Sequence, residues 1–169
     1  MVSAPLNSTE DVPQVVPTPP ALTWYVRGTL LGMALGWIVV FAIAAWLNPY
    51  KTDGSALRME THRQLGLPPC TFKVLSGLPC PSCGMTTSFA LLIHGDVWNS
   101  LKANAVGTLL ASFGLMFVPW SLASVICKRS LFIASMERAL MFLIGGFVTL
   151  MLLRWGIVLA LAWWLGSQF

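Results

Sequence analysis

The chain has 169 residues, of which 56% are hydrophobic and 9% are charged. Ordinary globular domains carry about 25% charged residues, and a soluble fold so poor in charge would expose large apolar patches. The composition therefore excludes an ordinary soluble domain and predicts an all-α integral membrane protein. The net charge of +4 comes from basic residues that lie mostly between apolar segments, so we expect them to set topology and to contact lipid rather than nucleic acid.

The N-terminal segment differs from the rest of the chain. Residues 1–22 are polar and rich in proline, which predicts a disordered tail before a membrane domain over 23–169. No basic start runs directly into an apolar stretch, so we predict no cleavable signal peptide. The first apolar segment should then remain as a membrane anchor.

Three apolar segments are long enough to cross a hydrocarbon core of about 30 Å. They run over about 28–47, 105–126 and 139–165. In the first, Gly32 and Gly36 form a pair of small residues that permits close approach of another helix. In the second, Pro119 is expected to produce a kink.

Arg154 lies inside the third predicted span. An arginine at the centre of a span costs about 2.5–3.5 kcal/mol on insertion scales, so it should have a partner or reach the membrane surface. Candidate partners are Asp96, backbone carbonyls of the short apolar stretch described next, a lipid phosphate or another protein. Structural and functional roles for Arg154 both stay open.

Residues 48–104 are too long for a plain linker between the first two spans. Within them, 85–93 is apolar but too short to cross a membrane, which predicts a re-entrant or interfacial helix. Asp96 and Asn104 follow it. We favour a capping role for both over catalysis, because their side chains can accept hydrogen bonds from the free amides at helix starts.

Charge between the spans predicts the orientation in the membrane. The short loop after the second span holds Lys128, Arg129 and Arg138, which favours the cytoplasm by the positive-inside rule. The N-terminus would then be cytoplasmic and the loop over 48–104 extracytoplasmic. The basic residues of that long loop favour the opposite arrangement, but long loops bias orientation less.

The most distinctive motif lies in that loop. Cys80-Pro-Ser-Cys83-Gly84 has the form of a zinc knuckle, and Cys70 stands upstream as a third sulfur ligand. We expect a structural zinc site or a structural disulfide. The fourth metal ligand is expected to be His94, with alternatives at His62, Glu60 and Asp96.

Two other functions remain open for the same residues. A Cys-x-x-Cys pair at a helix start can exchange thiols for a disulfide. The alternative is therefore that Cys80 and Cys83 are catalytic residues that pass electrons to a quinone or a partner thiol, with Cys70 as a relay. A small transporter subunit would use Arg154 and the re-entrant stretch, and would need an oligomer. Cys127, at the end of the second span, is expected to be an inert packing residue.

The pattern resembles a bacterial membrane family known as domain of unknown function 2752. The resemblance rests on Leu78-Pro-Cys-Pro-Ser-Cys-Gly-Met-Thr-Thr, the apolar stretch after it, His94-Gly-Asp and the later asparagine. The matching positions are Cys70, Cys80, Cys83, Gly84, Thr86, Gly95, Asp96 and Asn104. Thr87 departs from the pattern, because many members have arginine there. The resemblance implies a multi-pass protein of the bacterial inner membrane and no established reaction, so we expect an accessory or binding protein with a membrane-protein partner or a second copy of itself.

Overall fold

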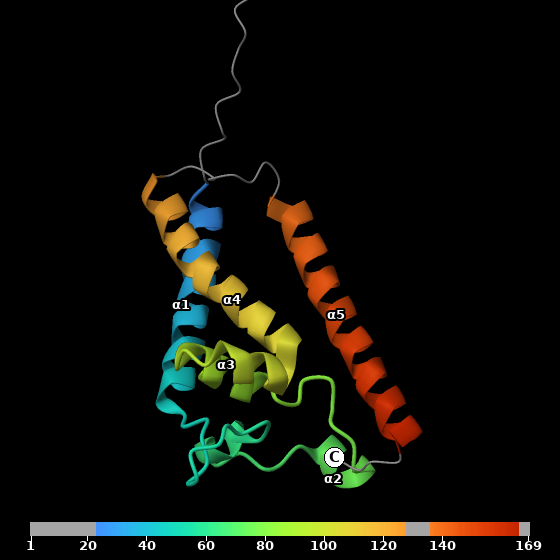
Figure 1. Cartoon of the computed structure of the whole chain (residues 1–169). Helices are drawn as coiled ribbons and strands as arrows, with labels where there is room; N and C mark the ends of the chain where they lie inside the picture. The colour runs from blue at the N-terminus through green and yellow to red at the C-terminus, as the bar shows by residue number, and fades with distance from the viewer. Residues whose placement is uncertain (1–22, 128–135, 166–169) are drawn as a thin grey trace, which may run out of the picture.

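A computed structural model describes residues 23–127 and 136–165 of the chain, as drawn in Figure 1. The described part is helical. The long helices are α1 (Trp24–Trp46), α4 (Val97–Cys127) and α5 (Met136–Leu165). The short elements between α1 and α4 are the 3-10 helix η1 (Thr61–Leu65), α2 (Thr71–Ser76) and α3 (Met85–Ile93). The predicted tail over 1–22 lies outside the described residues.

The long helices confirm the three predicted spans. Each is long and apolar enough to cross a membrane, with mean hydropathies of 2.1, 1.9 and 2.0 in chain order. They are compatible with a multi-pass membrane protein. The helix α4 begins at Val97, earlier than the predicted span, because a first helical segment before Asn104 joins the segment that corresponds to the predicted span. The helical geometry of α4 breaks at Asn104 (φ −159°, ψ 102°), well before Pro119.

The short helix α3 occupies the predicted apolar stretch and lies crosswise against α1 and α4 (Figure 1). Its buried residues run from Thr87 to Leu91. The ring of Phe89 lies 6.2 Å from that of Trp37 and 6.4 Å from that of Phe41, centroid to centroid. Both partners belong to the interior of α1, so α3 packs against a membrane-length helix and not beyond its end.

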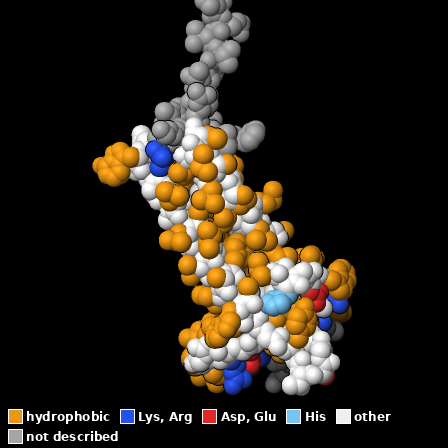
Figure 2. Space-filling view, turned by 90° about the vertical axis from the view of Figure 1, so that its left-hand side faces the viewer, with side chains coloured by type: hydrophobic (Ala, Val, Ile, Leu, Met, Phe, Trp, Pro, Cys, Tyr) orange, Lys and Arg blue, Asp and Glu red, His pale blue; other side chains and the backbone are white. Residues whose placement is uncertain are grey.

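The surface divides into an apolar and a polar part. In Figure 2 hydrophobic side chains cover the length of the long helices, and most of the visible charged and histidine side chains gather at the end that holds the short helices. Large exposed side chains such as Met116, Phe142 and Trp163 lie on the long helices. Such a surface suits lipid along the long helices and water or lipid headgroups around the short ones.

Candidate functional site

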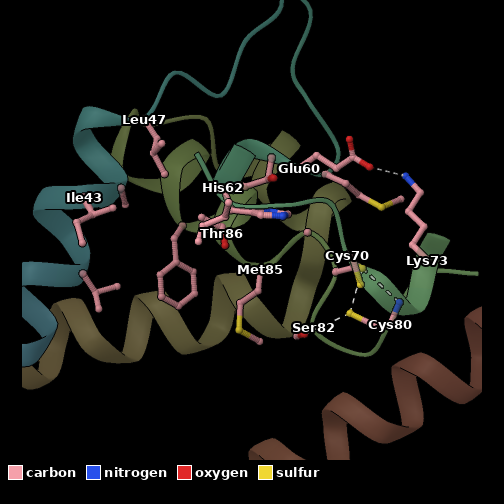
Figure 3. A pocket seen from close by; sticks show the side chains of 18 residues that line it. Ile43, Leu47, Glu60, His62, Cys70, Lys73, Cys80, Ser82, Met85 and Thr86 are labelled. Atoms are coloured by element: carbon pink, nitrogen blue, oxygen red, sulfur yellow. Dashed lines mark hydrogen bonds and ion pairs between the residues drawn. The ribbon is translucent and has the colours of Figure 1, made fainter. Parts of the chain in front are cut away.

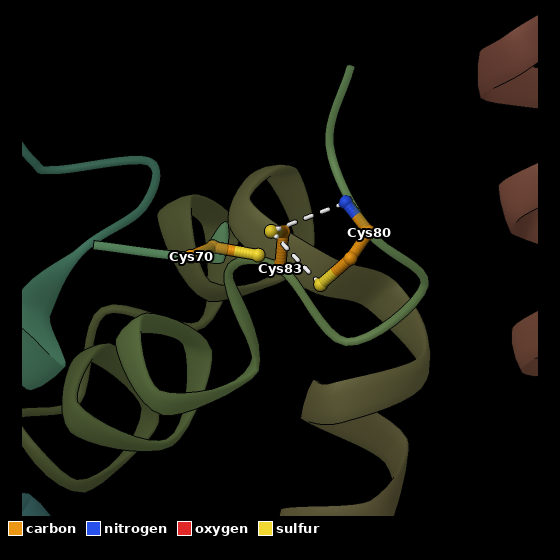
Figure 4. Close-up of side chains that lie close together, drawn as sticks. All are labelled: Cys70, Cys80 and Cys83. Atoms are coloured by element: carbon orange, nitrogen blue, oxygen red, sulfur yellow. Dashed lines mark hydrogen bonds between the residues drawn. The ribbon is translucent and has the colours of Figure 1, made fainter. Parts of the chain in front are cut away.

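The three loop cysteines converge in the structure, as Figure 4 shows. The sulfur atoms of Cys70, Cys80 and Cys83 all lie within 4.8 Å of one another. The sulfurs of Cys80 and Cys83 are 3.0 Å apart, and all three residues are partly buried free thiols. Cys127 is exposed at the end of α4 and lies outside this cysteine cluster. The sequence prediction of a single sulfur cluster therefore matches the geometry.

Local backbone structure brings the sulfurs together. Cys70 stands immediately before α2, whereas Cys80 and Cys83 lie on a tight turn closed by a hydrogen bond from the Cys83 N–H to the Cys80 carbonyl (3.1 Å). The Cys80 N–H donates to the Cys83 sulfur at 3.2 Å. An amide that points at sulfur stabilises its thiolate form, which is the form that binds metal.

Gly84 ends the turn and allows it to sit against α4. Its φ is +83°, a left-handed conformation that other residues rarely adopt. A Cβ atom at Gly84 would lie 2.7 Å from the Ala103 carbonyl oxygen and 3.0 Å from that of Arg58. The turn therefore reaches its position only because this residue has no side chain.

Asn104 joins the cysteine turn to the break in α4. Its Nδ2 donates to the Cys83 carbonyl at 3.2 Å, and its Oδ1 accepts the Gly107 N–H at 3.0 Å. The side chain thus caps the second part of α4 while it holds the turn. Asp96 caps the first part, since its Oδ1 accepts the Asn99 N–H at 3.1 Å. The hydrogen bonds from Asn99 keep the pKa of the Asp96 carboxyl below its usual value.

Arg154 reaches the same break from α5. Its Nη2 donates to the Ala103 carbonyl at 3.2 Å. In an unbroken helix this carbonyl would accept the Gly107 N–H, but that N–H is bonded to Asn104. The partner of Arg154 is therefore a carbonyl of α4, which was not among the candidates from the sequence: Asp96, carbonyls of the short apolar stretch, a lipid phosphate or another protein.

The neighbouring Trp155 makes a contact that was not predicted from the sequence. Its indole Nε1 donates to the Pro79 carbonyl at 2.9 Å, and its ring packs edge-on against Phe72 of α2 at 6.0 Å. Arg154 and Trp155 together attach α5 to both sides of the cysteine cluster. In the sequence, Trp155 is one apolar residue among many in a predicted span, and no pattern around it indicates a hydrogen bond to Pro79.

The two histidines lie in different places. His94 follows α3, where its Nδ1 contacts the Ala90 carbonyl at 2.8 Å and its ring lies 6.3 Å from Tyr50. Among the described residues, the group placed to hold a metal contains the three cysteines and neither histidine. His62 instead lines the same cavity as the sulfurs, and so does Glu60.

The electrostatics of Cys80 and Cys83 differ. Burial acts to raise the pKa of the Cys80 thiol, but hydrogen bonds from Ser82, Cys83 and Cys70 outweigh it and leave the pKa below the usual 9.0. Burial, followed by the hydrogen bond from Cys80, raises the pKa of Cys83 to about 12. Of Cys80 and Cys83, Cys80 is therefore the thiol that ionises first.

A cavity of about 530 Å³ opens beside the cluster (Figure 3). One wall is apolar and comes from α1 and α3, including Val40, Ile43 and Phe89. The opposite end holds the cysteines together with Glu60 and Lys73. The Lys73 ammonium lies 3.0 Å from the Glu60 carboxylate, and this contact lowers the pKa of Glu60.

Comparison with known protein families gives a match over part of the chain. Residues 70–118 match the family described as "Protein of unknown function (DUF2752)". No curated protein and no solved structure matches the chain. The matched segment begins at Cys70 and includes the cysteine turn, α3 and the break in α4. The resemblance seen in the sequence is thereby confirmed over the segment that carries the cysteine cluster, which is similar to the DUF2752 family.

Proposed function

We propose that Cys70, Cys80 and Cys83 bind a zinc ion that fixes the short helices at one end of a multi-pass membrane protein. The observation that supports this proposal is the convergence of three sulfurs from two separate segments. Tetrahedral zinc with Zn–S bonds of about 2.3 Å requires sulfurs about 3.8 Å apart. The separations here start at 3.0 Å and stay within 4.8 Å, so small side-chain rotations suffice.

The backbone favours a zinc knuckle over a thioredoxin-like pair. In a redox pair of that kind, the helix starts at the first cysteine and its free amides lower the thiol pKa. Here Gly84, with its left-handed φ, separates both cysteines from α3. The third sulfur, from Cys70, adds a ligand that a two-cysteine redox pair does not require.

We assign the fourth zinc ligand to His62 in place of His94. His62 borders the same cavity as the three sulfurs, and its Nε2 lies 3.3 Å from the Pro68 carbonyl. A hydrogen bond from one imidazole nitrogen to a carbonyl is the usual way in which a protein orients a metal-binding histidine. The other nitrogen, Nδ1, would be the ligand after a movement of the His62 side chain toward the sulfurs, because the close group contains the three cysteines alone.

Zinc at this position would act as a structural tie. The cysteine turn bonds to Asn104 of α4, and Pro79 just before it bonds to Trp155 of α5, so fixing the turn also fixes its contacts with two of the long helices. We further propose that the spans cross a bacterial inner membrane, with the zinc site on the extracytoplasmic side. The chain would serve as an accessory or binding protein and would not itself catalyse a reaction.

Metal analysis and thiol counting on the purified full chain test the proposal. We expect about one zinc per chain, and loss of most of it in Cys70→Ser, Cys80→Ser and Cys83→Ser. Cys127→Ser is the matched control and should keep its zinc, because Cys127 lies outside the cluster. A wild-type protein that takes up no zinc, even after refilling with the metal, would refute the proposal.

A thiol–disulfide oxidoreductase is the second candidate. It is favoured by the 3.0 Å separation of the Cys80 and Cys83 sulfurs and by their unequal pKa values. The two thiols would form one S–S bond and pass two electrons and two protons to a quinone, which becomes a quinol. Under this function Cys83→Ser should accumulate a mixed disulfide at Cys80 with a thiol partner, whereas the zinc proposal predicts none.

The third candidate, a transporter subunit, relied on an unpaired charge in the membrane. Arg154 instead donates a hydrogen bond within the protein. This contact favours a structural role for the arginine, and no further observation supports transport.

A further inference from the structure

We propose that the cavity beside the cysteine cluster binds a negatively charged lipid, with its apolar chain along α1 and its anionic head at Lys73. This inference deepens the proposed function by naming the ligand class. It rests on the proposed function in one respect: the cysteine turn forms one wall of the cavity and must therefore keep its position.

The apolar wall of the cavity belongs to the bilayer part of the molecule. Val40 and Ile43, in the second half of α1, are 41% and 40% exposed although α3 packs nearby. Both line the cavity, together with the buried side chains of Ala44 and Leu47. A volume of about 530 Å³ falls within the roughly 300–1,000 Å³ of typical ligand sites. The wall therefore suits an apolar chain that enters from the membrane.

At the polar end of the cavity, the lining residues Lys73 and Glu60 belong to a group of three charged side chains, whose third member, Arg63, lies outside the cavity lining. Glu60 is shared between Lys73 at 3.0 Å and Arg63 at 3.3 Å, which leaves one cation without its own counter-ion in this group. Over residues 48–104 the sequence has five basic and three acidic side chains, a balance of +2. An anionic head beside Lys73 would complement this charge, whereas a cationic head would oppose it.

The two ends of the cavity match the depth profile of a bilayer. The apolar end lies against a helix of membrane length, and the charged end lies among the short helices where polar side chains gather (Figures 2 and 3). Lys73 can lay its methylene stem against apolar groups while its ammonium meets an anionic head. The ligand would thus keep in the protein the orientation that it has in the membrane.

Photo-crosslinking tests this inference on the full chain in phosphatidylcholine nanodiscs. The probes are palmitic acid and phosphatidylglycerol with the same photoreactive acyl chain, plus photoreactive hexadecanol as a neutral analogue. We expect either anionic probe to label peptides that contain Ile43 or Leu67, about tenfold more strongly than hexadecanol does. Labelling by palmitic acid alone would indicate a free carboxylate ligand, and labelling by phosphatidylglycerol a phospholipid.

Three variants make the test specific. Ile43→Trp fills the cavity and Lys73→Glu reverses its charge, and each should lower labelling about tenfold, whereas Lys73→Arg should retain it. Leu35→Trp is the matched control, because Leu35 is 62% exposed on the same helix and does not line the cavity. Labelling that is uniform along α1, or equal for the neutral and anionic probes, would overturn the inference.

Metal analysis of the same samples separates the two proposals. Zinc-loaded protein without cavity labelling would refute the lipid site and leave the zinc site standing. Cavity labelling of protein without zinc would refute the zinc site and support the lipid site.

Discussion

The helix α4 packs closely against its neighbouring helices, whereas α5 makes few contacts with the rest of the described structure. One third (33%) of the most apolar stretch of α4 is buried within the structure, against 0% for the corresponding stretch of α5. In Figure 1, α4 crosses α1 and α3, and α5 stands to one side. Both helices have similar mean hydropathy, 1.9 and 2.0, so hydrophobicity does not explain the difference.

The two helices differ in whether a neighbouring helix packs onto their small residues. Added Cβ atoms at Gly107 and Gly114 would lie 2.4 Å from the Ser88 hydroxyl and 2.4 Å from the Trp37 ring, so α3 and α1 pack directly onto the backbone of α4. On α5, Gly145 and Gly156 have no neighbour within 4 Å of such an atom. In a membrane, helices associate through close packing and hydrogen bonds and not through hydrophobicity alone. The comparison teaches that α5 depends on its polar contacts at Arg154 and Trp155.

The largest expected effect comes from a methyl group at Gly84. Gly84→Ala places a Cβ 2.7 Å from the Ala103 carbonyl and requires an unfavourable φ of +83°. We expect a loss of stability on the order of 3 kcal/mol, seen as a large fall in thermal midpoint and in folded yield. Gly145→Ala on α5 is the control and should change the midpoint little. Equal effects of the two variants would contradict the difference between the helices.

A smaller effect is expected where α5 is attached. Arg154→Met removes the hydrogen bond to the Ala103 carbonyl, which should cost about 1.5–3 kcal/mol of α5 docking. Spin labels at Leu109 on α4 and Ile144 on α5, both exposed, should then report a broader distance distribution.

Two controls accompany that measurement. A label pair on Leu35 of α1 and Leu109 of α4 should keep its narrow distribution, because those helices pack independently of α5. Trp155→Phe removes the bond to Pro79 but keeps a ring against Phe72, so it should loosen α5 less than Arg154→Met does. An unchanged α4–α5 distribution in both variants would mean that lipid or another protein holds α5.

The smallest expected effect concerns the reactivity of the Cys80 and Cys83 thiols. In metal-free protein, alkylation of Cys80 should rise with pH through a midpoint below 9.0, because its thiolate is favoured. Cys83 should stay slow up to about pH 10, since its pKa is raised to about 12. Mass spectrometry after timed labelling gives both profiles. Ser82→Ala should shift the Cys80 midpoint upward, and identical profiles for the two cysteines would contradict this assignment.

The sequence predicted the features that depend on local pattern. Hydropathy and segment length predicted the three spans, and the short apolar stretch before Asp96 predicted the helix α3. The capping roles of Asp96 and Asn104 followed from their places before helical segments, and the spacing of Cys80 and Cys83 indicated a shared site. Each of these features depends on residues close together in the chain, where backbone chemistry constrains the structure strongly.

Long-range contacts were harder to predict. Gly32 and Gly36 have the spacing of a packing motif, but no atom lies within 4 Å of a Cβ added at either, and the close approaches fall on α4 instead. His94 is near the cysteines in sequence, yet α3 places it among Ala90 and Tyr50. Which helix face meets which neighbour depends on crossing angles, and one sequence does not contain that information.

X-ray absorption at the zinc edge, on purified full chain, tests the central claim most directly. The zinc proposal predicts three sulfur neighbours at about 2.3 Å and one nitrogen at about 2.0 Å. His62→Ala should replace the nitrogen with an oxygen, and His94→Ala should leave the spectrum unchanged. Protein without zinc in which Cys80 and Cys83 form a disulfide, or zinc bound by oxygen and nitrogen alone, would contradict the account.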